Sequence, residues 1–212
     1  MEAGEKYNIM VENVLKGVTN HMKFFSNKLL PGLTAGLMIG FAGAIFERVD
    51  NRYIGSVLFA IGLLAVLEYK LELYTGQVGY LKKWRPHLAT IFVMNVLGAF
   101  LMGKLFPMAG ELARLDRPLP EAFVAAIGCG VLMFLAVNGS GRIWALMCVP
   151  AFILAGFEHS IADAFYLSSH NAWSPEALLW LMVVAAGNAV GALTIGTIVT
   201  HHARNKGLPT KD

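Results

Sequence analysis

Two long uncharged runs restrict this chain more than any other feature. Residues 29–46 and 178–200 contain no Asp, Glu, Lys or Arg. Runs of about 18 to 20 apolar residues are long enough to cross the core of a bilayer as helices. Only 15% of the 212 residues are charged, against roughly 25% in a soluble domain. The chain is therefore predicted to be an integral membrane protein.

Composition excludes several other classes of protein. The formal net charge is only +3, with no dense basic block, which argues against a nucleic-acid partner. The two cysteines, Cys129 and Cys148, lie in apolar runs and suggest neither a disulfide framework nor a metal site. With about 20 residues in each span, the chain leaves no room for a soluble catalytic domain. We expect no enzyme activity and no cofactor.

The apolar segments predict an all-α membrane fold with six transmembrane helices. The segments cover residues 29–46, 53–73, 88–106, 122–137, 142–167 and 178–200. They form a transmembrane domain over residues 29–201, followed by a tail over 202–212. In residues 1–28, apolar side chains recur at helical spacing, which predicts an amphipathic helix. That helix either lies at the membrane interface or packs on the cytoplasmic face of the protein.

The basic residues predict the orientation of the chain. An even number of spans puts both termini on one side of the membrane. Loops on that side carry eleven basic residues: Lys6, Lys16, Lys23, Lys28, Lys82, Lys83, Arg85, Arg142, Arg204, Lys206 and Lys211. The other loops carry five: Arg48, Arg52, Lys104, Arg114 and Arg117. Because cytoplasmic loops are richer in Lys and Arg, both termini are predicted to be cytoplasmic.

A short motif occurs once in each half of the chain. The third segment contains Asn95-x-x-Gly-Ala, and the sixth contains Asn188-x-x-Gly-Ala. With three spans in each half, the second copy would enter the membrane from the opposite side. Such an inverted 3+3 repeat is typical of channels and transporters, whose pathway lies between the halves. Small residues at helix contacts are an alternative explanation of the motif.

Polar residues interrupt the second and the fifth segment. The second runs into Glu68, Lys70, Glu72 and Thr75, and the fifth runs through Gly156 into a polar stretch. Backbone can break at membrane depth only where it is buried in protein or lines a cavity. We therefore predict broken helices two and five, which together mark a transport pathway.

His159 is the one histidine that this pattern places deep in a span, and imidazole can exchange a proton near neutrality. Asp163 can share its helix face, whereas Glu158 is expected to brace the broken backbone. Thr75 offers a hydroxyl from the other half, so that Thr75 and His159 could meet at the centre of a pore. The alternatives are a neutral histidine that ties two helices together and a threonine in a plain turn.

These motifs resemble the formate/nitrite transporter family. The resemblance rests on the run Gly156-Phe157-Glu158-His159-Ser160, on Tyr74-Thr75-Gly76 and on the two Asn-x-x-Gly-Ala motifs, and it covers about residues 28–201. It implies an aquaporin-like protomer in a homopentamer, with one pore in each subunit. It also implies passage of small monovalent anions or their conjugate acids, such as formate, nitrite, hydrosulfide, lactate or acetate. His159 and Thr75 then lie at the pore centre, between two apolar constrictions.

The residues expected along the substrate pathway come from both halves. They are His159, Thr75, Glu158, Ser160, Asn95, Asn188, Leu71, Phe157, Lys70 and Asp163. Leu71 and Phe157 are the candidate apolar gates, with Phe41, Phe123 and Phe134 as weaker choices. Lys70 either pairs with a neighbouring glutamate or attracts the anion. Many family members carry a lysine between the fourth and fifth spans, where this chain offers only Arg142.

The resulting hypothesis is a channel in the cell membrane that protonates the anion at or near His159 and passes it as a neutral acid. Its partners are the small anion or acid, the lipid bilayer and further copies of the chain. Formate is the first candidate substrate. A channel for a neutral solute such as water, ammonia or hydrogen sulfide is the main alternative. A membrane-embedded enzyme that uses Glu158, His159 and Asp163 is a remote one, because the spacing lacks a second histidine.

Overall fold

The computed structural model describes residues 2–80 and 87–207, and every regular element in these residues is a helix. The first half contains α1 (Glu2–Phe24), the π-helical turn η1 (Phe25–Leu29), α2 (Leu30–Phe46), α3 (Arg52–Glu68), α4 (Tyr74–Gln77) and α5 (Leu88–Leu105). The second contains the 3-10 turn η2 (Ala113–Asp116), α6 (Leu119–Asn138), α7 (Ile143–Leu154), α8 (Ser160–Ser169) and α9 (Pro175–Asn205). Lys82, Lys83, Arg85 and Lys211, which contribute to the predicted orientation, lie outside the described residues.

Within the described residues, four helical stretches are long and apolar enough to cross a membrane. They are Asn27–Phe46, Leu88–Leu105, Leu119–Asn138 and Pro175–Asn205. The second and fifth apolar segments of the sequence take another form, because each folds as two helices with a non-helical stretch between them. Residues 69–73 separate α3 from α4, and residues 155–159 separate α7 from α8.

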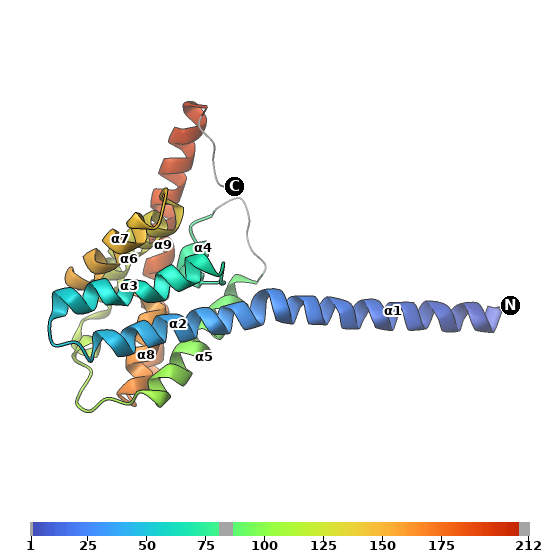
Figure 1. Ribbon diagram of the computed structural model, residues 1–212, viewed down its shortest axis with the longest axis horizontal. Coiled ribbons are helices and arrows are strands. Elements are labelled where there is room, and N and C mark those ends of the chain that lie inside the picture. The colour runs from blue at the N-terminus through green and yellow to red at the C-terminus, as the bar shows by residue number, and fades with distance from the viewer. Residues whose placement is uncertain (1, 81–86, 208–212) are drawn as a thin grey trace.

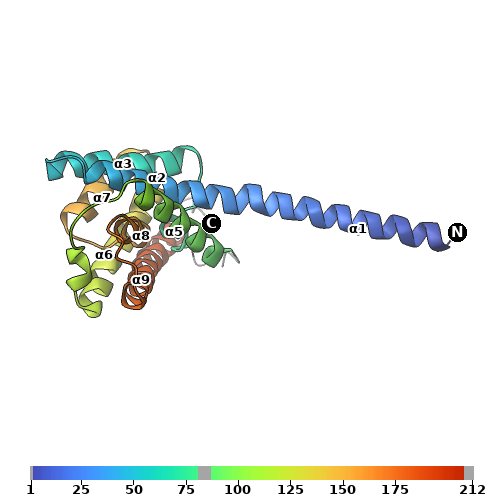
Figure 2. The same ribbon diagram turned by 90° about the horizontal axis from the view of Figure 1, so that it is seen from below.

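The helices after α1 pack into one body, and α1 projects from it (Figure 1). The view from below also shows α1 leaving the body in line with α2 (Figure 2). The apolar side chains of α1 that the structure describes, among them Val14, Leu15 and Met22, are exposed. The predicted amphipathic helix is therefore present. Its apolar face is not packed against any other described part of the chain.

Polar side chains begin several of the helices. The side chain of Asn51 accepts hydrogen bonds from the backbone N–H groups of Tyr53 and Ile54, which caps α3. Ser174 caps α9 by accepting from the N–H of Ala177, and Pro175 follows it at the first helical position. The sequence therefore fixes where these helices start by local chemistry.

Glycine lets the long helices approach closely in two pairs. In the contact between α2 and α5, a Cβ on Gly36 would lie 2.0 Å from the backbone oxygen of Asn95. In the contact between α6 and α9, a Cβ on Gly191 would lie 2.0 Å from the backbone oxygen of Ile127. Backbone this close leaves no space for any side chain, so each pair depends on glycine at its crossing.

Candidate functional site

The first interruption is a tight helix end followed by extended chain. Lys70 has a left-handed backbone with φ of 52°, and the N–H of Leu71 donates to the carbonyl of Val66 at 2.9 Å. This hydrogen bond and the left-handed residue form a Schellman motif, which satisfies carbonyls at the end of α3. Leu73 is extended, and α4 begins at Tyr74.

The second interruption repeats this geometry. Gly156 has φ of 69°, and the N–H of Phe157 donates to the carbonyl of Phe152 at 2.9 Å. His159 is extended, and α8 begins at Ser160. Leu71 and Phe157, the two candidate gates, thus occupy the same position of the same motif in the two halves.

Asn95 and Asn188 hold the two interruptions in place from neighbouring helices. Asn95 accepts from the N–H of Tyr74 at 2.8 Å and donates to the carbonyl of Glu72 at 2.8 Å. Asn188 accepts from the N–H of Ser160 at 3.0 Å and donates to the carbonyl of Glu158 at 2.8 Å. Both amides are fully buried, and each satisfies backbone groups that the interruption leaves without helical partners.

Thr75 and His159 meet where the two halves come together. The Thr75 Oγ1 atom lies 2.9 Å from His159 Nε2, and the exposed fractions of these residues are 1% and 2%. Thr75 follows the first interruption and His159 ends the second, so the contact joins residues 84 positions apart. The structure thus brings together the two side chains that the sequence placed at a pore centre.

The other ring nitrogen of His159 determines which tautomer is present. Nδ1 accepts a hydrogen bond from the backbone N–H of Ala162 at 3.1 Å, which caps α8. An accepting Nδ1 carries no proton, so in the neutral ring Nε2 carries it and donates to Thr75 Oγ1. The Thr75 hydroxyl then keeps its own hydrogen for another acceptor. The hydroxyl of Ser160 is also buried and has no hydrogen-bond partner in the described residues.

Phe152 contacts the histidine directly, and sequence reasoning missed it. Its ring is stacked on the imidazole of His159, with centroids 5.7 Å apart and an interplanar angle of 18°. The weaker gate candidates Phe41 and Phe134 lie elsewhere: Phe41 is exposed beside Phe106, and Phe134 packs beside Tyr80. The signal for Phe152 is its place in the last turn of α7, which required knowing where that helix ends.

Two arginines from the segment between α5 and α6 bind the carboxylates around His159. Arg114 pairs with Asp163 and, at 3.1 Å, with Glu158. Arg117 pairs with Glu158 at 2.7 Å and donates to the carbonyl of Gly156 at 2.9 Å. Burial would lower the pKa of the Arg114 guanidinium, but the charges of Asp163, Tyr166 and Glu158 raise it above its usual value. Arg114 therefore stays charged.

Two acidic residues, Glu68 at the end of α3 and Glu72 in the first interruption, have partners other than Lys70. Glu72 pairs with Lys28 and accepts from Gln77. Glu68 is exposed and pairs with Arg142 at 2.9 Å. Lys70 is exposed as well. Of the two alternatives for Lys70, pairing with a neighbouring glutamate is therefore not found among the described residues, where Glu68 and Glu72 have other partners.

The cations expected to attract the anion and the cations beside His159 lie at different interruptions, since Arg142 pairs with Glu68 at the end of α3. Sequence reasoning considered Arg142 and Lys70 for this role. The cations that reach the histidine-bearing interruption are Arg114 and Arg117, which precede α6. The spacing of neighbouring residues cannot predict a contact between residues about 40 positions apart. These arginines come close to Glu158 only in the folded chain.

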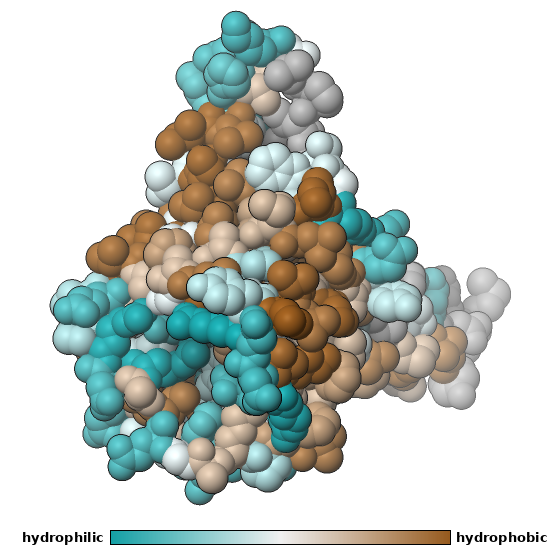
Figure 3. Space-filling model, turned by 60° about the vertical axis from the view of Figure 1, so that its left-hand side comes forward, coloured by the Kyte–Doolittle hydropathy of each residue, from teal (hydrophilic) through white to brown (hydrophobic). Residues whose placement is uncertain are grey.

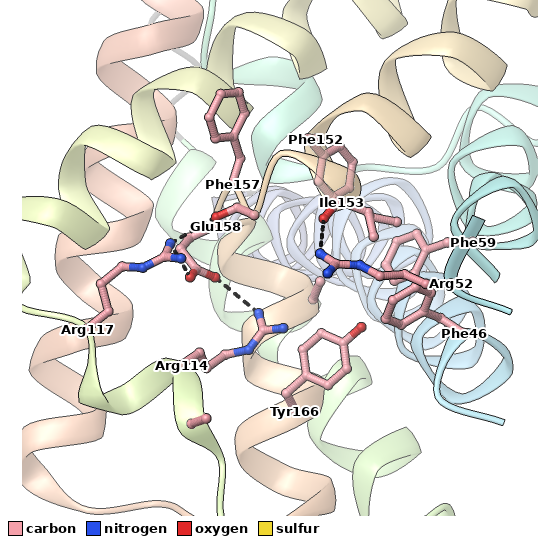
Figure 4. Close-up of a pocket in the computed structure, with 13 residues that line it drawn as sticks. Phe46, Arg52, Phe59, Arg114, Arg117, Phe152, Ile153, Phe157, Glu158 and Tyr166 are labelled. Carbon is pink, nitrogen blue, oxygen red and sulfur yellow. Dashed lines mark hydrogen bonds and ion pairs between the residues drawn. The ribbon is translucent and has the colours of Figure 1, made fainter. Parts of the chain in front are cut away.

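A cavity of about 460 Å³ lies against this cluster. Figure 4 shows three arginines around it, with Arg52 reaching in from α3 and Arg114 and Arg117 near Glu158. Aromatic side chains complete the lining, namely Phe46, Phe59, Phe152, Phe157 and Tyr166. Figure 3 shows hydrophilic side chains around a hollow at the end of the molecule away from α1, beside an apolar surface. The cavity thus combines positive charge at its rim with an apolar wall.

Known proteins were compared in sequence and in structure. No family model matches the chain. The chain is 24% identical over 227 residues to the probable formate transporter of Methanothermobacter thermautotrophicus, a match that covers 74% of this chain and 81% of that protein. It is 24% identical over 220 residues to the formate channel FocA of Escherichia coli strain K12, covering 79% and 75%.

Solved structures share the fold. An FNT family ion channel superposes with a TM-score of 0.71 at 20% identity, over 88% of this chain and 92% of that one. A pentameric formate channel with formate bound gives a TM-score of 0.55 at 20% identity, over 84% and 92%. The sequence relatives are transporters and channels, and the apolar helices make this chain a multi-pass membrane protein. In sequence and in fold, the chain is thus similar to formate transporters and to an FNT family ion channel.

Proposed function

We propose that the chain is a channel for small monovalent anions or their conjugate acids, with formate as the first candidate. The contact between Thr75 Oγ1 and His159 Nε2 carries this proposal. It is buried, it joins the two halves, and it leaves a threonine hydroxyl hydrogen for a substrate oxygen. The names of the relatives, a probable formate transporter and a formate channel, point to the same substrate.

The architecture of the proposal has six membrane crossings in an inverted 3+3 repeat. The α3–α4 and α7–α8 pairs would be the broken helices two and five, since each carries a Schellman end and an asparagine clamp. Both termini would lie in the cytoplasm, with residues 1–28 and 202–212 outside the channel domain. Five copies would form a homopentamer in the cell membrane, as the pentameric neighbour suggests.

The mechanism separates capture from crossing. The anion would collect in the cavity among the arginines and reach the Phe152 wall near His159. An ion crossing an apolar constriction loses its hydration at a high cost in free energy, whereas the neutral acid loses far less. The anion would therefore gain a proton at or near His159 and cross as the acid. Leu71 and Phe157 would line the apolar constrictions.

Flux through proteoliposomes tests this function. We expect formate uptake that accelerates as the pH on the entry side falls, since each crossing consumes a proton there. His159→Phe and Thr75→Ala should each reduce uptake at least about tenfold, because the loss of one hydrogen bond to a polar transition state costs about 1.4 kcal/mol or more. Undiminished, still pH-dependent uptake in the His159 variant would refute the proton step.

The main alternative is a channel for a neutral solute, in which His159 only donates a hydrogen bond. The neutral tautomer supports this alternative, because Nδ1 already accepts from Ala162 and cannot also hold a proton. The same liposomes separate the two functions. A neutral-solute channel would carry water with little dependence on pH and would not carry formate. A metal enzyme built on Glu158, His159 and Asp163 is disfavoured, because both carboxylates pair with Arg114 and His159 bonds Thr75.

A further inference from the structure

The three arginines at the cavity differ in what they bind. Arg114 is held by Asp163 and Glu158, and Arg117 is held by Glu158. The guanidinium of Arg52 donates to the backbone carbonyl of Ile153 at 3.1 Å. Within residues 2–80 and 87–207, Arg52 has no carboxylate partner. Among the described residues, Arg52 is therefore the one of these three arginines whose charge is not held in an ion pair.

The chemistry of guanidinium makes this charge available to a ligand. A guanidinium has five N–H donors in a planar fork, and the contact with Ile153 uses one nitrogen of Arg52. The remaining donors match a carboxylate, which accepts two parallel hydrogen bonds from such a fork. Arg52 is also exposed, so that it keeps contact with water while it lines the cavity. An incoming anion can therefore reach it without breaking an existing ion pair.

The position of Arg52 connects the cavity rim to the histidine. Figure 4 shows Arg52 beside Phe46 and Phe59, on the side of the cavity away from Arg117. The ring of Phe59 meets Phe152 edge-on with centroids 6.1 Å apart, and Phe152 is in turn stacked on His159. An anion held at Arg52 would thus lie at the outer end of an aromatic wall whose inner end is the imidazole.

We propose that Arg52 is the residue that captures the anion at this cavity. It binds a small carboxylate or similar monovalent anion before the anion reaches Phe152, and it raises the local anion concentration by its uncompensated charge. The inference rests on the proposed anion transport and adds the residue that selects for charge at the entrance. Because Arg52 acts before the crossing step, its charge affects the concentration dependence of transport and leaves the maximal rate unchanged.

Three variants test this role in oriented proteoliposomes. Arg52→Gln keeps an N–H donor for Ile153 and removes the charge, and Arg52→Lys keeps the charge. Arg48→Gln is the matched control, since Arg48 precedes α3 in the same connection but lies over the Phe106 ring, 5.0 Å from its centroid, and donates to Ala44. Arg48 does not line the cavity.

We expect Arg52→Gln to raise the apparent KM for formate about fivefold or more, as expected when a unit charge near the ligand is removed. The maximal flux should stay within about twofold, and Arg52→Lys and Arg48→Gln should keep KM within about twofold. The change should occur for entry from one face of the membrane only and should shrink at high ionic strength, where screening weakens the field. An unchanged KM in Arg52→Gln, or an equal rise in Arg48→Gln, would overturn the inference.

A second measurement separates this inference from the proposed function. Binding of formate to the detergent-solubilised protein can be followed by saturation-transfer NMR, which needs no transport. The wild-type signal should exceed that of Arg52→Gln and match that of Arg48→Gln. No formate flux in the wild-type protein would contradict the proposed function alone. Equal binding by the wild type and Arg52→Gln would contradict capture by Arg52, whatever the flux.

Discussion

Asn95 and Asn188 make the same three hydrogen bonds in the two halves of the chain. Each side-chain oxygen accepts from the first N–H after an interruption, Tyr74 in one half and Ser160 in the other. Each side-chain nitrogen donates to the carbonyl of a glutamate in the interruption and to a carbonyl of a neighbouring helix, Gly32 or Ala126. Each asparagine therefore ties the glutamate-bearing stretch of its own half to a neighbouring helix.

Replacing either asparagine by aspartate should destabilise the protein. The carboxylate keeps the acceptor but turns two donated hydrogen bonds into contacts between oxygen atoms, and each unsatisfied buried group costs about 1 to 3 kcal/mol. We expect Asn188→Asp and Asn95→Asp each to lower the midpoint of thermal unfolding in mild detergent by at least about 5 °C. Asn205→Asp, on the exposed end of α9, is the control and should leave the midpoint unchanged. A stable Asn188→Asp variant would contradict the role of the clamp.

Alanine in place of the crossing glycines should also destabilise the fold. Gly36→Ala and Gly191→Ala each place a methyl group about 2.0 Å from a backbone oxygen, and overpacking of this kind costs about 1 to 3 kcal/mol. Thermal unfolding of the purified protein measures the effect. Gly17→Ala, in exposed helix α1 with no atom within 4 Å of the added carbon, should instead be neutral or slightly stabilising. Equal midpoints for the three variants would argue against close packing at these crossings.

The pair between Asp163 and Arg114 should behave as a coupled unit. Asp163 is fully buried, so Asp163→Leu removes one of the two carboxylate partners of Arg114. Removing one partner of a buried ion pair costs about 3 to 5 kcal/mol, and the remaining pair with Glu158 puts the expected cost at the lower end of that range. Asp163→Asn keeps a hydrogen-bond acceptor and should cost clearly less. Combining Asp163→Leu with Arg114→Met should recover part of the loss, and a double-mutant cycle by thermal unfolding measures the coupling. Additive effects would show that the two side chains act independently.

The exposed pair of Glu12 and Lys16 is the control and should show no coupling.

Much of the fold could be predicted from the sequence, because a membrane-spanning helix requires a continuous run of apolar residues that can be recognised locally. The uncharged runs at residues 29–46 and 178–200 fall within helices, and the polar stretches mark where the second and fifth segments are interrupted. The first and last residues of the helices were harder to predict from the sequence. The sixth segment, predicted over 178–200, extends to Pro175–Asn205, because Ser174 caps it and its last turns continue past the apolar run.

The site was predictable where a residue type is unusual at its depth and not where distant segments meet. His159 and Thr75 stood out because a titratable ring and a hydroxyl lay where polar stretches interrupt two apolar segments, and Thr75 Oγ1 lies 2.9 Å from His159 Nε2 in the fold. Arg114 and Arg117 looked like ordinary loop cations. Their contacts with Glu158 depend on how the segment before α6 folds back on α8, which no local pattern encodes.

Phe152 should determine how strictly the pathway excludes ions. Its ring lines the arginine-containing cavity and stacks on the imidazole of His159, with centroids 5.7 Å apart. Phe152→Ala would open the apolar constriction to water, which lowers the desolvation cost of an ion. In planar bilayers we therefore expect this variant to pass formate as a measurable current with weak pH dependence, while the wild type passes much less. Phe152→Leu should stay close to wild type, and so should Phe41→Ala, which removes a ring from the exposed side of α2. If Phe152→Ala carried no more current than Phe41→Ala, the barrier to ions would have to lie at Leu71 or Phe157 instead.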